Sequence, residues 1–286
     1  MGVNNVMQKI TFINARGESV EIGYQFPFFL NKIEGLGDVD AEIQTSKSPF
    51  QDGSEPIDVL MNERVIPIEV AILKDFEINR QILSRIFNPK LGEGLLIYEN
   101  GFVKRQIRAI SEHVPKYPDD RPRQSQKAII DLFCANPYWE DINPTNVKLE
   151  DFVSNFSFPF SFPVSFATRG DTRTLINEGD VPTPVKITFR GESVNPKITK
   201  LNTGETLRIK RTIPDGYSLV ITTDFNNKSV QIIAPDGVKT DAMGYIDLDL
   251  PWSFFSLDVG ENQLSFITEG GKPDVFIEYK NLYVGV

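Results

Sequence analysis

Residues that could carry out chemistry are scarce in this sequence and follow no catalytic spacing. The 286-residue chain holds one histidine and one cysteine, which excludes metal sites and catalytic triads that need several imidazoles or thiolates. Gly35 to Asp40 begins like a dinucleotide-binding fingerprint, but Asp40 stands where the third glycine belongs, and no helix pattern follows. Walker-loop, nucleophile-elbow, HExxH and CxxC motifs are absent from the sequence. We therefore expect no enzyme, no cofactor and no metal site.

The isolated reactive side chains have simpler structural interpretations. Asp247, Asp249 and Asp258 could supply the two acids that glycoside hydrolysis requires. Surface acids are the simpler reading, because the net charge of the chain is -9. His113 is expected at a loop or strand end, and Cys134 is expected to be a small buried hydrophobe at the end of an apolar strand.

Two aromatic residues keep a binding function open. Trp252 follows a proline, and Tyr245 lies a few residues before it. Aromatic rings of this kind can stack on sugars, although packing at a domain edge is the simpler interpretation for Trp139 and for Trp252. A carbohydrate-binding adhesion module that contacts the host cell wall is therefore an alternative function, with Trp252 and Tyr245 as weak contact candidates.

Composition and charge narrow the class of protein. Hydrophobic residues make up 40% of the chain and charged residues 24%, which is typical of a globular protein with a real core. No apolar run approaches the roughly 18 residues of a membrane span. A pI near 4.9 argues against a general nucleic-acid or anionic-membrane binder. The N-terminus lacks the pattern of a secretory signal, so we expect an unsecreted, thiol-reduced protein.

The elements of the first half are mostly strands. Residues 8–13 and 18–22 predict a β-hairpin. Residues 64–73 are rich in β-branched side chains, but Pro67 predicts an edge strand or a bulge. Asp75 to Phe87 shows helical spacing with Asp75 as N-cap, and its apolar stripe predicts a core-facing side.

A basic cluster surrounds a long loop in the same half. Residues 115–124 are polar and contain three prolines, and an ordinary hairpin loop is only about 2 to 5 residues long. One interpretation is an arm that meets an acidic surface on another copy of the chain, and the other is a solvated loop. The interface candidates of this cluster are Arg105, Arg108, Arg121 and Arg123.

An aromatic segment divides the chain. Residues 151–166 alternate Phe with Ser and Pro, which indicates an extended linker with one buried face. The interface candidates here are Phe156, Phe158, Phe160 and Phe162. From residue 171 onward, short strand patterns recur about every 8 to 12 residues with turn signals between them, which is typical of an antiparallel sandwich. The predicted domains are 1–140 and 171–286, joined by the linker 141–170.

The order of these short motifs resembles that of the phage distal tail proteins in the siphovirus tail-component family. In the first half the matching motifs are the N-terminal hairpin, Ile33–Gly37, Asp52–Gly53, Arg64–Ile68, Phe87–Pro89, Gly94–Tyr98 and Leu132–Trp139. In the second half they are Phe158–Phe160, Asn177–Pro184, Ile187–Gly191, Asn195–Ile198 and Asn202–Glu205. The resemblance extends over nearly the whole chain.

The resemblance implies a fold and a set of partners. It implies a mainly β protein, with a tail-tube-like N-terminal β-sandwich that carries one α-helix and a galectin-like antiparallel β-sandwich at the C-terminus. It implies a homo-hexameric ring, a baseplate hub at the virion tail tip of a phage or prophage, assembled in the host bacterial cytoplasm. The implied partners are the tail tube protein, the tape-measure protein end, a tail-associated fibre or lysin protein and a receptor-binding protein.

Overall fold

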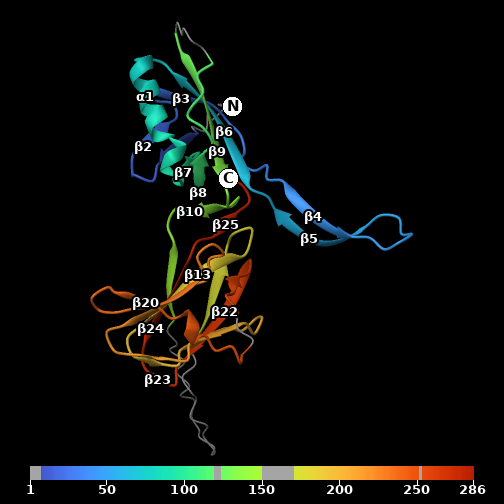
Figure 1. Ribbon diagram of the computed structural model, residues 1–286, viewed down its shortest axis with the longest axis vertical. Helices are drawn as coiled ribbons and strands as arrows, with labels where there is room; N and C mark the ends of the chain where they lie inside the picture. The colour runs from blue at the N-terminus through green and yellow to red at the C-terminus, as the bar shows by residue number, and fades with distance from the viewer. Residues whose placement is uncertain (1–7, 119–123, 150–170, 251–252) are drawn as a thin grey trace, which may run out of the picture. The chain divides into compact units, whose positions relative to one another are not determined.

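The computed structural model describes residues 8–118, 124–149, 171–250 and 253–286. The chain divides into two compact units (Figure 1). Unit 1 consists of Met1–Ile142 together with Tyr283–Val286, and unit 2 consists of Asn143–Leu282. Strands dominate both units, and the described residues form a single α-helix. The predicted fold class, mainly β with one helix, is confirmed.

Unit 1 is built on one large antiparallel sheet in the order β2-β1-β7-β8-β9-β6-β3, with β10 added beside β8 and β25 beside β10. Strands β4 and β5 form a separate two-stranded sheet. The elements are β1 (Lys9–Ile13), β2 (Ser19–Ile22), β3 (Phe28–Ile33), β4 (Ala41–Ser46), β5 (Glu55–Met61), β6 (Arg64–Ile72), α1 (Phe76–Ile86), the 3₁₀ turn η1 (Pro89–Leu91), β7 (Gly94–Glu99), β8 (Lys104–Ser111), β9 (Gln126–Cys134), β10 (Trp139–Asp141) and β25 (Leu282–Tyr283).

Helix α1 covers the core of unit 1 through the predicted apolar stripe. Leu83, Ile86 and Phe87 are buried, and the ring of Phe87 stacks on Phe12 at a centroid distance of 4.7 Å. The N-cap falls at the predicted residue, but the expected capping hydrogen bond does not form. Asp75 stands at the N-cap position with a left-handed φ of 48° and makes no side-chain capping hydrogen bond. Packing rather than capping therefore fixes this helix.

Strand β6 lies inside the sheet, so the first alternative predicted from Pro67, an edge strand, is wrong. The ladder of β6 with β3 does contain a register shift, but it falls between Leu30 and Lys32 on β3 and not at Pro67. β6 pairs with β9 along its whole length and with β3 on its other side. The carbonyl of Pro67 accepts a hydrogen bond from the Glu34 amide at 3.0 Å, and the β3 ladder ends at Ile33 opposite Ile68. In an antiparallel strand, the N and C=O of one residue face the same neighbour. The missing N–H therefore faces the side on which β3 is ending.

Unit 2 is an antiparallel assembly of three sheets. The largest has the order β11-β24-β13-β18-β19-β20 with β21 beside β13, the second β12-β22-β15-β16, and the third β17-β14-β23. The elements are β11 (Thr145–Leu149), β12 (Asp171–Asn177), β13 (Thr183–Arg190), β14 (Ser193–Val194), β15 (Lys197–Lys200), β16 (Thr206–Arg208), β17 (Thr212–Ile213), β18 (Ser218–Thr222), β19 (Ser229–Ile233), β20 (Lys239–Asp241), the 3₁₀ turn η2 (Met243–Tyr245), β21 (Ser256–Leu257), β22 (Gly260–Ile267), β23 (Gly270–Gly271) and β24 (Asp274–Tyr279).

Two segments of unit 2 differ from the sequence-based expectation. Thr145–Leu149 falls within the predicted linker but forms β11, which pairs with β24. One of the short strand patterns that recur after residue 171, at residues 243–249, instead begins with the turn η2 at Met243. The core of unit 2 lies between its sheets, where Phe189 and Phe266 meet edge to face with ring centroids 6.2 Å apart.

Candidate assembly interface

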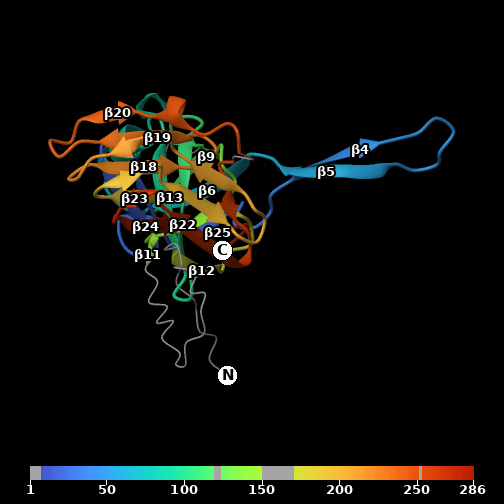
Figure 2. The same ribbon diagram turned by 90° about the horizontal axis from the view of Figure 1, so that it is seen from below.

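The hairpin of β4 and β5, residues 41–61, is here called the arm. Figures 1 and 2 both show it extending away from the large sheet of unit 1. Every residue of β4 is exposed, and so is every residue of β5 except Met61. A two-stranded hairpin is at best marginally stable in water without a further strand or a packing partner. The arm therefore presents surface that its own unit does not cover.

The register of the arm sorts its side chains into two faces. Ile43 lies opposite Val59, and Ala41 lies opposite Met61. Directly opposed residues share one face of a sheet, so these four side chains form an apolar face. Ile43 is 60% exposed and Val59 is 54% exposed.

The other face of the arm is mainly polar. Gln44 lies opposite Asp58, and Glu42 lies opposite Leu60. The register shifts by a bulge after Gln44, and bulges increase the local twist of a hairpin. An arm with one apolar face and one acidic face is suited to lie on another protein surface through the apolar side.

The turn of the arm contains the Asp52–Gly53 motif and two residues with positive φ. Phe50 has a φ of 68°, and Gly53 has a φ of 77°. The Phe50 ring is fully exposed. In the second strand of the arm, apolar residues alternate at Ile57, Val59 and Met61, and the sequence-based expectations above do not include a strand there. That period-2 pattern is the signal that could have found the second strand.

The predicted arginines of β8 are engaged within unit 1. Arg105 is partly buried, and its guanidinium lies 3.4 Å from the ring centroid of Tyr283. Arg108 is exposed and forms an ion pair with Glu93 at 3.1 Å. The structure therefore does not bring these two candidates together as a free basic patch.

Several interface and contact candidates lie outside the described residues, so their role stays a prediction. They are Arg121, Arg123, Phe156, Phe158, Phe160, Phe162 and Trp252.

His113 and Cys134 occupy the simple structural positions that were expected for them. His113 follows β8, and its Nε2 lies 2.7 Å from Asp131 Oδ2. Cys134 is fully buried at the end of β9. Burial raises the pKa of the Cys134 thiol to about 12, so the reactive thiolate is not formed near neutral pH.

Tyr245 is exposed, but one face of its ring is in contact with the side chain of Arg211. The guanidinium of Arg211 lies 4.3 Å from the ring centroid, which is within the range of a cation–π contact. One face of the ring is thus covered within unit 2. A sugar that stacked on this face would have to displace Arg211.

The three aspartates weighed as catalytic acids are paired with cations. Asp247 is buried, with Oδ1 2.7 Å from Lys210 Nζ, and Lys210 also pairs with Asp249 at 2.6 Å. The hydrogen bond from Lys210 holds the pKa of Asp247 below its ordinary value. A general acid needs a raised pKa, so this direction argues against that role for Asp247.

Asp258 forms an ion pair with a buried lysine, Lys200. Lys200 is 1% exposed, and its Nζ donates to Asp258 Oδ2 at 2.6 Å and to the Ser256 carbonyl at 2.8 Å. A buried ammonium has to be paired and hydrogen-bonded. The pair therefore reads as a structural contact of unit 2.

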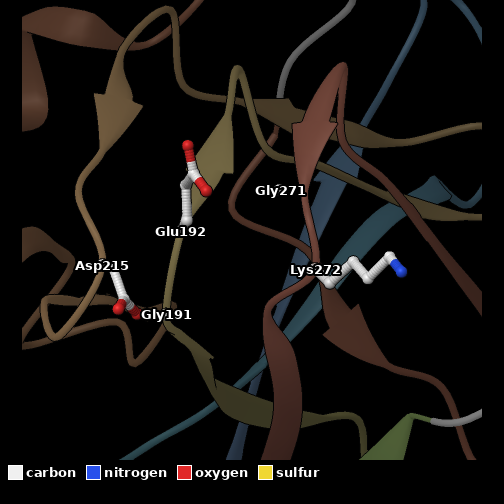
Figure 3. A pocket seen from close by; sticks show the side chains of 5 residues that line it. All are labelled: Gly191, Glu192, Asp215, Gly271 and Lys272. Carbon is white, nitrogen blue, oxygen red and sulfur yellow. The ribbon is translucent and has the colours of Figure 1, made fainter.

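The depression shown in Figure 3 does not bring together side chains in a catalytic arrangement. It is open, has a volume of about 470 Å³, and is lined by Gly191, Glu192, Asp215, Gly271 and Lys272. The Lys272 side chain points away from the two carboxylates.

No group of three or more His, Cys, Asp or Glu side chains in the described part could hold a metal ion. No helix among the described residues is long and apolar enough to span a membrane.

Comparison with family models gives two matches that together span most of the chain. Residues 15–134 match the phage tail protein RIFT-related domain. Residues 178–283 match the C-terminal domain of the siphovirus-type tail component. No curated protein matches the chain.

Solved structures share the fold at low sequence identity. The SPP1 Dit protein, described as a paradigm of the hub adsorption apparatus in phages that infect Gram-positive bacteria, aligns with a TM-score of 0.68 at 12% identity, over 96% of this chain and 98% of that chain. A chain of the phage P2 baseplate in its activated conformation with Ca aligns with a TM-score of 0.55 at 12% identity, over 96% and 98% of the two chains. The corresponding baseplate with Sr gives 0.54 at 12% identity, over 98% of each chain.

Proposed function

Because this chain belongs to the siphovirus-type tail component family, we propose that it is a distal tail protein that forms a closed hexameric ring. In this proposal the ring is the hub that joins the tail tube to the baseplate and the adhesion apparatus. The chain acts as a structural part of the virion and carries out no catalysis.

The uncovered apolar face of the arm is the observation that carries the ring proposal. Ile43 and Val59 are more than half exposed on a hairpin that forms a sheet of its own and that the described residues of its unit leave uncovered. In a ring every arm has a neighbour, because the arm of each subunit contacts the next subunit on one side and the arm of the previous subunit contacts it on the other. Such head-to-tail contacts close when the rotation closes, so that apolar surface is buried without the growth of filaments.

The proposed location and partners follow from the hub role. The ring would stand at the tail tip of a phage or prophage virion, after assembly in the host bacterial cytoplasm. On one side it would meet the tail tube protein and the end of the tape-measure protein. On the other side it would meet a tail-associated fibre or lysin protein and a receptor-binding protein.

The Phe-rich segment supplies a second proposed contact. We propose that Phe158 and Phe160 are buried at a ring or inter-domain contact, because six phenylalanines gather between residues 151 and 166. Replacement of both by Ser should give a monomer or an aggregate in light scattering. An unchanged hexamer would remove this segment from the proposal.

Electron microscopy of the purified protein tests the proposal directly. Six-fold rings with a central hole are the expected result. Scattered monomers at micromolar concentration, with a folded circular dichroism spectrum, would contradict the ring. A glycan array probed in parallel would reveal sugar binding, which no observation among the described residues favours.

A further inference from the structure

The last residues described belong to unit 1, although all of unit 2 precedes them in the chain. Tyr283 and Val286 pack against the core of unit 1. The Val286 amide donates to the carbonyl of Leu36 at 3.1 Å, and β25 pairs with β10. Residues 283–286, here called the returning segment, are therefore held by both backbone and side-chain contacts.

Arg64 is the most unusual member of this contact, because it is a cation that is 2% exposed. The charge of Asp38 acts on it more weakly than burial does. Its Nη1 donates to the Gly35 carbonyl at 2.7 Å, and its Nη2 donates to the Val284 carbonyl. Its Nε finds no acceptor among the described residues. Burial lowers the pKa of this arginine, which is the sign of a poorly solvated charge.

Unit 1 needs the returning segment because that segment supplies one of the hydrogen-bond acceptors of Arg64. A buried charge that loses one of its few partners is strongly destabilising. Without the Val284 carbonyl, Arg64 would keep only the Gly35 carbonyl as an acceptor among the described residues. The interior of unit 1 is thus completed by a carbonyl that lies 220 residues after Arg64 in the chain.

Arg105 and Gly285 complete the contact on its other side. The Arg105 guanidinium covers the Tyr283 ring and donates to the Gly285 carbonyl. A Cβ placed on Gly285 would lie 3.3 Å from both the Leu36 carbonyl oxygen and the Gly37 Cα. The fit is therefore close, and a larger residue at this position would press against backbone rather than against a flexible side chain.

We propose that Arg64, Arg105 and the backbone of Leu36 form a peptide-binding cradle in unit 1, whose occupant is the returning segment and whose occupancy makes unit 1 competent to assemble. Residues 283–286 are synthesised after the whole of unit 2, and domains begin to fold during synthesis. Unit 1 therefore completes its sheet only after unit 2 has been made. The effect on assembly rests on the ring of the proposed function, whereas the cradle itself does not.

Two full-length variants and one truncation test the cradle. Gly285→Val should push the returning segment out, and a chain that stops at Leu282 lacks the segment. Gly244→Val is the matched control, because a Cβ at Gly244 meets nothing within 4 Å. Hydrogen exchange should become faster in β10 and at residues 35–37 in the first two proteins, with unit 2 unchanged. By mass photometry, both should need a protein concentration about tenfold or more above that of the control to form rings.

Restoration in trans separates the cradle from a general loss of folding. A labelled peptide with the sequence of residues 281–286 should bind the truncated chain saturably and slow its exchange in β10, whereas a scrambled peptide should not. Absence of binding, or exchange in the truncated chain equal to that of the full chain, would overturn the cradle. If the truncated chain forms rings as readily as the full chain, control of assembly is overturned. If the full chain forms no ring but the peptide binds, the cradle stands and the proposed ring fails.

Discussion

The apolar face of the arm offers the sharpest test of ring assembly. The change is the double substitution Ile43→Thr and Val59→Thr. Threonine is β-branched and favours strands, so the hairpin itself should persist. Because the two side chains oppose each other on one face, both substitutions act on the same contact.

The size of the effect follows from exposure. Full burial of an Ile or Val side chain is worth about 1.5–3 kcal/mol. Ile43 is 60% exposed and Val59 is 54% exposed, so a neighbour that covers both would gain about 2–3 kcal/mol per contact from the exposed parts. The loss of that gain weakens each subunit contact by about 30- to 150-fold.

Mass photometry across a dilution series measures this shift. The double variant should dissociate at a concentration higher by that factor, with its thermal unfolding unchanged because neither side chain belongs to the core. The matched control is Glu42→Thr with Gln44→Thr on the opposite face of the same strand, which should leave the rings intact. Equal dissociation of the two variants, or none in either, would refute the assignment of the apolar face as the buried one.

Three further predictions concern the two cores. Lys200→Met should lower the stability of unit 2 by about 1–2 kcal/mol in chemical denaturation, because it removes two buried hydrogen bonds. The control Lys186→Met removes an exposed ion pair and should lower stability by less than about 0.5 kcal/mol. Equal losses would argue against a structural role for the buried Lys200 ammonium. The hydrogen bond from Lys210 lowers the pKa of Asp247 below its ordinary value of 3.8. Its contribution to stability is therefore present above that pH and is lost as the pH falls through the lowered folded-state pKa. Asp247→Asn should flatten the fall in melting temperature below about pH 4, as measured by thermal denaturation. Because burial raises the pKa of Cys134 to about 12, a thiol reagent at pH 8 should react with the unfolded chain only, and rapid labelling of the folded protein would contradict the buried position.

Local patterns in the sequence predicted several elements correctly. The hairpin of β1 and β2, the helix α1 and the buried position of Cys134 all follow from periodicity within a few residues. Such patterns report which face of an element is apolar, and this was sufficient to place the core.

What the sequence could not give was long-range pairing. Pro67 suggested an edge strand, because a local rule cannot show on which side the neighbouring ladder ends. Nothing near residue 283 signals that the chain returns to unit 1, since that choice depends on Arg64 and Leu36 far away in sequence. The arm was partly missed for a related reason. Its apolar face looks like an ordinary strand face, and only the structure shows that its own unit leaves it uncovered.

The path of the chain through unit 1 has a further consequence for engineering and evolution. The chain leaves unit 1 at Ile142 and re-enters it at Tyr283, next to β10 and β25, which pair with each other. Exit and entry thus lie side by side, the arrangement in which a domain insertion is tolerated. Unit 2 can be regarded as a cassette. A different domain whose termini lie close together could therefore replace unit 2, and residues 283–286 would still follow it and pair with unit 1.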